Sequence, residues 1–169
     1  PVERKNIGCK NDTFLLMMVA GFRYQKDQDT IIRALTLLPK NVQLCLVGDG
    51  DRRVECKELV KRLNLEERVV FTGVRSDIPN VLKAADVVVM SSHLEGFGLA
   101  AVEGMAAGKP VVASDVVGLR DIVKNYGCVF PQGDERRLAE IVERLKNDSN
   151  FYKTLAGQCY LRSDRKSTR

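Results

Sequence analysis

Short apolar segments alternate with amphipathic segments along almost the whole chain, and this alternation restricts the fold more than any other feature. Several apolar runs have the length and the β-branched content of buried strands. They lie at residues 13–20, 42–47, 69–71, 85–90, 111–114 and 128–130. The remaining segments favour helices at residues 29–38, 52–63, 99–108, 119–124 and 135–146, with a short helix ending at 85 and a terminal one from 150. Apolar strands separated by helices are typical of parallel sheets. We therefore predict an α/β fold with a doubly wound, Rossmann-like parallel sheet.

The length and composition of the chain fit one globular domain. Its 169 residues are 44% hydrophobic and 29% charged, which is enough to bury a full core. Residues 1–12 are polar and are expected to form a linker, so the domain is expected to span residues 13–169. Because the chain begins with Pro1 rather than methionine, we expect it to be a fragment of a longer protein.

The segment 91–114, SSHLEGFGLAAVEGMAAGKPVVAS, contains the clearest candidate site. It follows a predicted strand and leads through a glycine-bearing loop into a helix, an arrangement whose free backbone N–H groups bind anions. We expect the amides of Gly98, Leu99 and Ala100 to be the donors. Glu95 and Glu103 lie on either side of these amides, and a carboxylate accepts hydrogen bonds from the hydroxyls of a sugar or ribose. The pattern therefore predicts a nucleotide-sugar site.

The segment EGFGLAAVE, with Glu95 and Glu103 separated by seven residues, and the following MAAGKPVVAS resemble the signature of retaining GT-B glycosyltransferases of the group 1 (family 4) type. The resemblance implies that the chain is the C-terminal half of such an enzyme, with the N-terminal acceptor-binding lobe absent. It implies that Glu103 binds the ribose and that Glu95 faces the donor sugar as the catalytic residue. Phe97, Gly98, Leu99 and Ala100 would present amides to the sugar and diphosphate.

Two further loops carry residues that the resemblance implicates. In AGFRYQKD, Lys26 matches the family lysine that holds the diphosphate, whereas the family arginine position falls on Gly21. Arg23 lies two residues away and is a candidate replacement, with a solvated loop charge as the alternative. The FTG segment before Val74 resembles the loop that contacts the nucleobase, with a plain strand-end turn as the alternative.

Other candidate motifs are weaker. Two D-x-D pairs, at 27 and 29 and at 49 and 51, have a spacing found in metal sites, but Asp51 and Asp77 are both better explained as helix caps. No metal and no cofactor are expected. His93, the only histidine, is expected to be a loop bystander because no serine or cysteine near it resembles a nucleophile elbow.

Charge and cysteine content indicate the surroundings of the protein. The formal net charge is +5, but basic and acidic residues mostly alternate, so nucleic acid is not an expected partner. The basic run at 162–169 is expected to be a frayed tail, with a lipid or RNA contact as the alternative. Five cysteines without a CxxC pair favour a reducing compartment. We expect a cytoplasmic protein, with peripheral contact at the inner face of the membrane open for the full-length protein.

The expected function is transfer of a sugar from a UDP-, GDP- or ADP-linked donor to a glycan, lipid-linked or small-molecule acceptor, with the fragment alone not fully active. The alternative is a non-catalytic GT-B-like module that binds a nucleotide sugar or a partner. A sugar-nucleotide epimerase is a further possibility among enzymes. A nicotinamide dehydrogenase is disfavoured, because AGFRYQ after the first strand is not GxGxxG.

Overall fold

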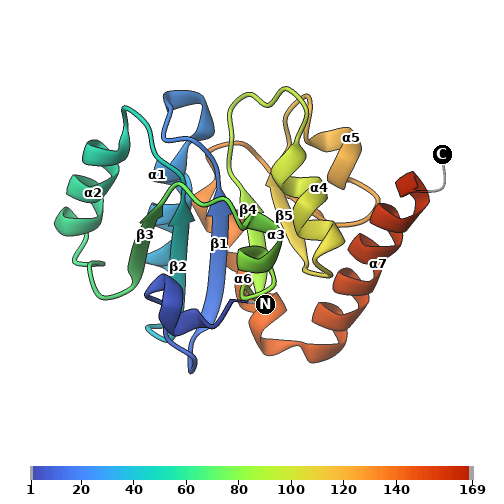
Figure 1. Cartoon of the computed structure of the whole chain (residues 1–169), viewed down its shortest axis with the longest axis horizontal. Coiled ribbons are helices and arrows are strands. Elements are labelled where there is room, and N and C mark those ends of the chain that lie inside the picture. The colour runs from blue at the N-terminus through green and yellow to red at the C-terminus, as the bar shows by residue number, and fades with distance from the viewer. Residues whose placement is uncertain (1, 168–169) are drawn as a thin grey trace.

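The computed structural model describes residues 2–167 and contains one six-stranded sheet covered by helices on both faces (Figure 1). All paired strands are parallel, in the order β3-β2-β1-β4-β5-β6. The strands are β1 Phe14–Val19, β2 Val42–Val47, β3 Val69–Gly73, β4 Val87–Met90, β5 Val111–Ser114 and β6 Cys128–Phe130. This order confirms the predicted doubly wound, Rossmann-like parallel sheet.

The helices divide between two apolar layers, one on each face of the sheet. Residues of α1 (Gln28–Leu35), α2 (Arg53–Arg62) and α6 (Glu135–Asn147) pack on one face. Residues of α3 (Ile78–Leu82), α4 (Leu99–Ala106) and α5 (Arg120–Val123) pack on the other. Alternate strand residues enter opposite layers, as Leu16 and Met17 of β1 illustrate. Among the described helices, none has both the length and the apolarity of a membrane span.

The two ends of the chain are more ordered than the sequence indicates. The expected linker packs on the domain: it contains the short 3₁₀ helix η1 (Arg4–Ile7), and Ile7 and Cys9 are buried. Arg4 is 2.9 Å from the carboxylate of Asp86. At the other end α7 (Ser149–Ser167) is helical through most of the expected frayed tail, of which residues 168 and 169 lie outside the described part. Leu155 and Cys159 of α7 join opposite layers, so this helix connects them.

The strand order creates a crevice at the carboxyl ends of β1 and β4. β1 lies between β2, which follows it in sequence, and β4, which returns from the far side. The connection after β1 leads to one side of the sheet and the connection after β4 leads to the other side. The two connections therefore diverge at the carboxyl ends of these neighbouring strands. Ligands of open α/β sheets bind at such a reversal. The loops after β1 and β4 are the two that carry most of the predicted site residues.

Candidate functional site

Two predicted site residues meet across the crevice. Lys26 lies in the short 3₁₀ helix η2 (Tyr24–Lys26) after β1, and Glu95 lies in the loop after β4. The Lys26 Nζ atom is 2.8 Å from Glu95 Oε2, and the two side chains are 22% and 11% exposed. Ser92 Oγ donates a second hydrogen bond, of 3.1 Å, to the same carboxylate oxygen. The structure thus brings together a cation and a carboxylate that are 69 residues apart in sequence.

Five contacts connect the loop after β1 with the residues after β4, and the Lys26–Glu95 pair is one of them. His93 Nε2 lies 2.9 Å from Asp27 Oδ2, and the His93 backbone N–H donates to the Gln25 carbonyl at 2.8 Å. Ser91 Oγ donates to the Asp27 carbonyl at 2.8 Å. The imidazole also meets the Tyr24 ring edge-on, with centroids 5.2 Å apart. His93 is therefore a fixed contact between the loops rather than the expected bystander.

Asp27 has a second role that the sequence indicated only as part of a D-x-D pair. It precedes α1 with φ of 51°, and its carboxylate accepts hydrogen bonds from the backbone N–H and hydroxyl of Thr30. Asp27 is thus the N-cap of α1 as well as the partner of His93. The local signal for this cap was the aspartate three residues before a threonine in the first helical turn, whereas nothing local indicated its pairing with His93.

Arg23 lies beside the position at which the family arginine is missing. A Cβ atom built on Gly21 would be 3.8 Å from Arg23 Nε and 3.6 Å from the Asp49 carbonyl oxygen, both ordinary contacts. The Arg23 side chain is exposed and has no carboxylate partner among residues 2–167. It borders a hollow of about 270 Å³ at the carboxyl edge. The lining residues are Gly21, Arg23, Lys26, Asp49, Gly50 and Asp51. Arg23 thus lies in van der Waals contact with the Cβ position of residue 21.

The first turn of α4 presents the predicted amide donors at the crevice. Gly98 is the N-cap residue with φ of 61°, and no side chain caps this helix. This φ favours glycine, and a Cβ atom at Gly98 would also lie 3.1 Å from the Gly118 carbonyl oxygen, closer than most such contacts. Phe97 and Leu99 are 82% and 64% exposed, and Ala100 is half-buried. The helix therefore begins with free N–H groups beside two uncovered apolar side chains.

Glu103 and Val74, the residues predicted for the ribose and the base, lie in or near the segment between β3 and the end of α4. Glu103 is exposed and lines a hollow of about 220 Å³ with Pro79 and Lys83 of the neighbouring α3 segment. Val74 directly follows β3 and is 79% exposed. The loop that begins at Val74 leads into α3, which packs against α4. The residues predicted for base and ribose thus come from adjacent elements, but the structure shows no direct contact of Glu103 with Glu95.

An ion pair stabilises the loop that carries Val74. Arg75 donates two hydrogen bonds to the Asp77 carboxylate, of 2.9 and 2.7 Å, and these bonds hold the pKa of Asp77 below its ordinary value. Asp77 occupies the N-cap position of α3 without making the side-chain bond expected of a cap, because its carboxylate faces Arg75. Asp51 is not a cap either, since the N-cap residue of α2 is Arg52.

The described residues contain no group of three or more histidine, cysteine or acidic side chains able to hold a metal ion. In the two D-x-D pairs, Asp29 binds Arg52 at 3.1 Å and Asp49 accepts a hydrogen bond from the Gly50 N–H. Burial and the nearby Asp29 raise the pKa of Cys56 to about 12, so this thiol is not a nucleophile at neutral pH.

Comparison with known proteins identifies the fold class of this chain and the protein family to which it belongs. The fold is that of the C-terminal half of a GT-B glycosyltransferase. The chain belongs to the family of glycosyl transferases group 1, whose model matches residues 1–160. An uncharacterized glycosyltransferase of Methanocaldococcus jannaschii is 37% identical over 155 residues, which cover 88% of this chain and 40% of that protein.

Two solved structures support this assignment. The Anabaena protein HepE in complex with UDP-glucose has a TM-score of 0.90 and 32% identity, over 96% of this chain and 46% of that one. The C-terminal domain of a glycosyl transferase group 1 family protein from Francisella tularensis has a TM-score of 0.81 and 25% identity, over 92% of this chain and 87% of that domain. This chain thus spans less than half of the M. jannaschii protein and of HepE.

Proposed function

We propose that this chain is the donor-binding lobe of a retaining glycosyltransferase, which transfers a sugar from a nucleoside-diphosphate sugar to an acceptor. The observation that carries the proposal is the Lys26–Glu95 pair at the crevice, beside the free N-terminus of α4. A basic side chain and uncapped helix amides favour a diphosphate, and a half-buried carboxylate favours sugar hydroxyls. The UDP-glucose complex of HepE supports the choice of a uridine nucleotide as the first ligand to test.

The nucleotide would extend from the hollow beside Arg23 and Lys26 to the hollow beside Glu103. Backbone groups of Val74 would contact the base and Glu103 the ribose hydroxyls, since the loop after β3 and α4 are joined through α3. Arg23 and Lys26 would hold the diphosphate. The amides of Phe97, Gly98, Leu99 and Ala100 would face the phosphates and the sugar.

The chemistry assigned to these residues is stabilisation of a leaving group. Departure of the nucleoside diphosphate builds negative charge on its phosphate oxygens, and fixed amides with Lys26 and Arg23 stabilise that charge without requiring a metal. In the free lobe Lys26 is bonded to Glu95. Binding of the diphosphate would move Lys26 onto the phosphate and leave Glu95 to accept sugar hydroxyls and to favour the positive charge that develops on the sugar ring.

Calorimetric titration with UDP, GDP and ADP tests the proposal. We expect one of these nucleotides to bind and Glu103→Ala to weaken that binding about tenfold, through loss of a charge-assisted hydrogen bond to the ribose. Glu58→Ala removes an exposed glutamate on α2 and is the matched control. Unchanged affinity in Glu103→Ala would remove Glu103 from the ribose role, and absence of binding by all three nucleotides would contradict the donor-binding function.

A further inference from the structure

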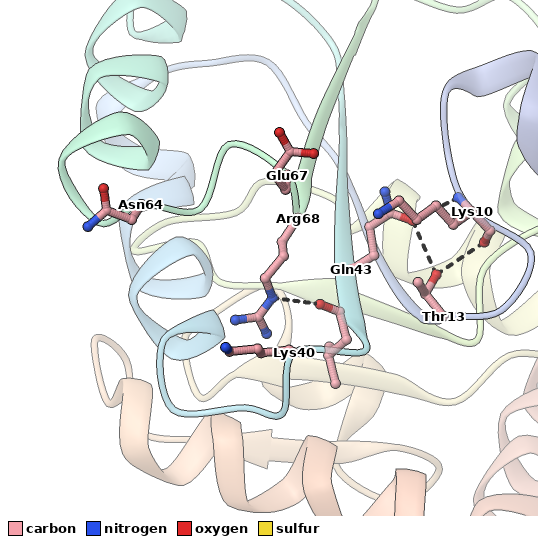
Figure 2. Close-up of a pocket in the computed structure, with 8 residues that line it drawn as sticks. Lys10, Thr13, Lys40, Gln43, Asn64, Glu67 and Arg68 are labelled. Atoms are coloured by element: carbon pink, nitrogen blue, oxygen red, sulfur yellow. Dashed lines mark hydrogen bonds between the residues drawn. The ribbon is translucent and has the colours of Figure 1, made fainter.

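A second pocket lies at the amino ends of the strands, whereas the proposed donor site lies at their carboxyl ends. It has a volume of about 340 Å³, within the range of small-molecule sites. Thr13 directly precedes β1, Val42 and Gln43 begin β2, and Arg68 directly precedes β3, so the pocket lies at the amino ends of these strands. Figure 2 shows Lys10, Thr13 and Gln43 on one side of it and Arg68 with Lys40 on another. Nothing in the donor-binding function uses this pocket.

Gln43 is a buried polar side chain with unused hydrogen-bond donors. It belongs to a strand whose residues are all buried, and it is only 3% exposed. Its Oε1 atom accepts hydrogen bonds from the Lys10 backbone N–H at 2.9 Å and from Thr13 Oγ1 at 3.1 Å, which fixes the orientation of the amide. Within residues 2–167 no acceptor bonds the Nε2 group of Gln43, although this side chain lines the pocket. An amide whose donors bond no protein acceptor is satisfied either by water or by a ligand that enters the pocket.

Three cationic side chains surround the same cavity without carboxylate partners. Lys10, Lys40 and Arg68 line it, and none of them forms an ion pair with any described residue. Arg68 is half-buried and, among the described residues, donates only to backbone carbonyls, at 3.1 Å to Val42, 2.7 Å to Pro39 and 3.3 Å to Leu38. These neutral acceptors fix the guanidinium but leave its charge uncompensated. Burial also lowers the pKa of Arg68.

The chemistry of the lining specifies an anion with several acceptor oxygens. The donors without a partner among residues 2–167 are the Gln43 amide nitrogen, two ammonium groups and Nη1 of Arg68, whose Nε and Nη2 already bond carbonyls. Together they match the oxygens of a phosphate group. Glu67 is the only carboxylate among the lining residues, and it could accept a hydrogen bond from a hydroxyl on the same ligand. We propose that this pocket binds a phosphate ester, as a second site that is independent of the donor site at the other edge of the sheet.

The test uses the whole chain and inorganic phosphate as the probe, at constant ionic strength adjusted with chloride. In a ¹⁵N NMR titration, we expect saturable shifts of the amides of Lys10, Thr13, Gln43 and Arg68. Lys10→Gln/Lys40→Gln removes two exposed side chains that hold no ion pair, and it should weaken this binding about tenfold or more. Lys153→Gln removes one exposed lysine on α7 and is the control for a general charge effect.

The outcomes separate this site from the donor site. Affinity for UDP should be the same in the Lys10→Gln/Lys40→Gln variant as in the unaltered chain, so loss of phosphate binding does not depend on the donor-binding function. Absence of shifts at these amides, or an equal loss in Lys153→Gln, would overturn the proposal. A further arm identifies the source of the phosphate ester. Flotation with phosphatidylcholine vesicles that contain phosphatidic acid, but not with phosphatidylcholine alone, would indicate a lipid headgroup; phosphate binding without flotation would indicate a free phosphate ester.

Discussion

At the scale of single residues, the proposed diphosphate site raises the question of which arginine lies beside Gly21. Arg23 Nε lies 3.8 Å from the Cβ position of residue 21, and φ of Gly21 is outside the left-handed region. A side chain at position 21 would therefore fit with no backbone strain. Under the proposed function, Arg23 would take the role of the family arginine from a position two residues away.

If Arg23 has the role of the family arginine, its removal should weaken UDP binding and an arginine at position 21 should restore it. Arg23→Ala should weaken UDP binding about tenfold, because one charge-assisted contact to the diphosphate is removed. Gly21→Arg/Arg23→Ala should recover most of that affinity, since the new arginine starts beside the vacated space. Calorimetry on the two variants measures both effects. Arg62→Ala, at the exposed end of α2, is the charge-matched control. Equal UDP affinity in Arg23→Ala and the unaltered chain would show that Arg23 is only a solvated loop charge.

Site residues could be predicted from the sequence where a single loop contained the complete motif. Lys26 and Glu95 each belong to a short motif with a chemical meaning, and the structure brings them together. His93 and Asp27 were not predictable as a pair, because their contact depends on β4 lying next to β1 rather than on any local pattern. Gln43 shows the same limit. Its position in an apolar strand is visible in the sequence, whereas its bonds to Lys10 and Thr13 depend on how residues 2–12 fold back.

At the scale of elements, periodicity predicted the strands and helices well but not what their ends contact. The helix expected at 29–38 ends at Leu35 as α1, although Leu38 remains in the core. The segment 1–12 was expected to be a linker because it is polar. In the structure the guanidinium of Arg4 bonds the Asp86 carboxylate and the carbonyls of Thr13 and Ala84, and this anchors the segment. Long-range side-chain bonds of this kind leave no periodic signal.

The hydrogen bond from Tyr152 of α7 to Asp86, directly before β4, predicts how the free energy of unfolding depends on pH. Tyr152 Oη donates to the Asp86 carbonyl at 2.6 Å, and burial raises the pKa of Tyr152 to about 12 from 10.0. Because the folded pKa is the higher one, the stabilisation is complete below pH 10 and is lost as pH rises through about 12. Tyr152→Phe should lower the free energy of unfolding at neutral pH by about 1 kcal/mol.

Urea denaturation measured at neutral pH and at several values above pH 10 tests this prediction. The unfolding free energy of the unaltered chain should fall more steeply with alkaline pH than that of Tyr152→Phe. Tyr160→Phe is the control, since Tyr160 lies on the same helix and is 52% exposed. Identical pH dependence in the unaltered chain and Tyr152→Phe would contradict the assignment of this bond to the stability of α7.

At the scale of the whole molecule, the rim of the donor site is apolar and uncovered. Leu94, Phe97, Leu99 and Val117 are between 64% and 82% exposed, and all four lie in or beside the loops after β4 and β5. Large exposed apolar side chains that gather at one place mark a contact surface. This chain also spans 40% of its M. jannaschii relative and 46% of HepE. Under the proposed function, this rim is the surface on which a second, acceptor-binding lobe would lie.

A two-lobe enzyme predicts that this chain binds a nucleotide but transfers sugar poorly. Without a second lobe the acceptor is not positioned against the donor sugar, and loss of positioning costs on the order of 10²-fold or more in rate. We expect the isolated chain to bind UDP in calorimetry, whereas chromatography should detect release of UDP from UDP-glucose at a useful rate only with the full-length protein and its acceptor. Equal rates for the isolated chain and the full-length protein would contradict the two-lobe arrangement. Nucleotide binding with no transfer by either would instead favour a non-catalytic binding module.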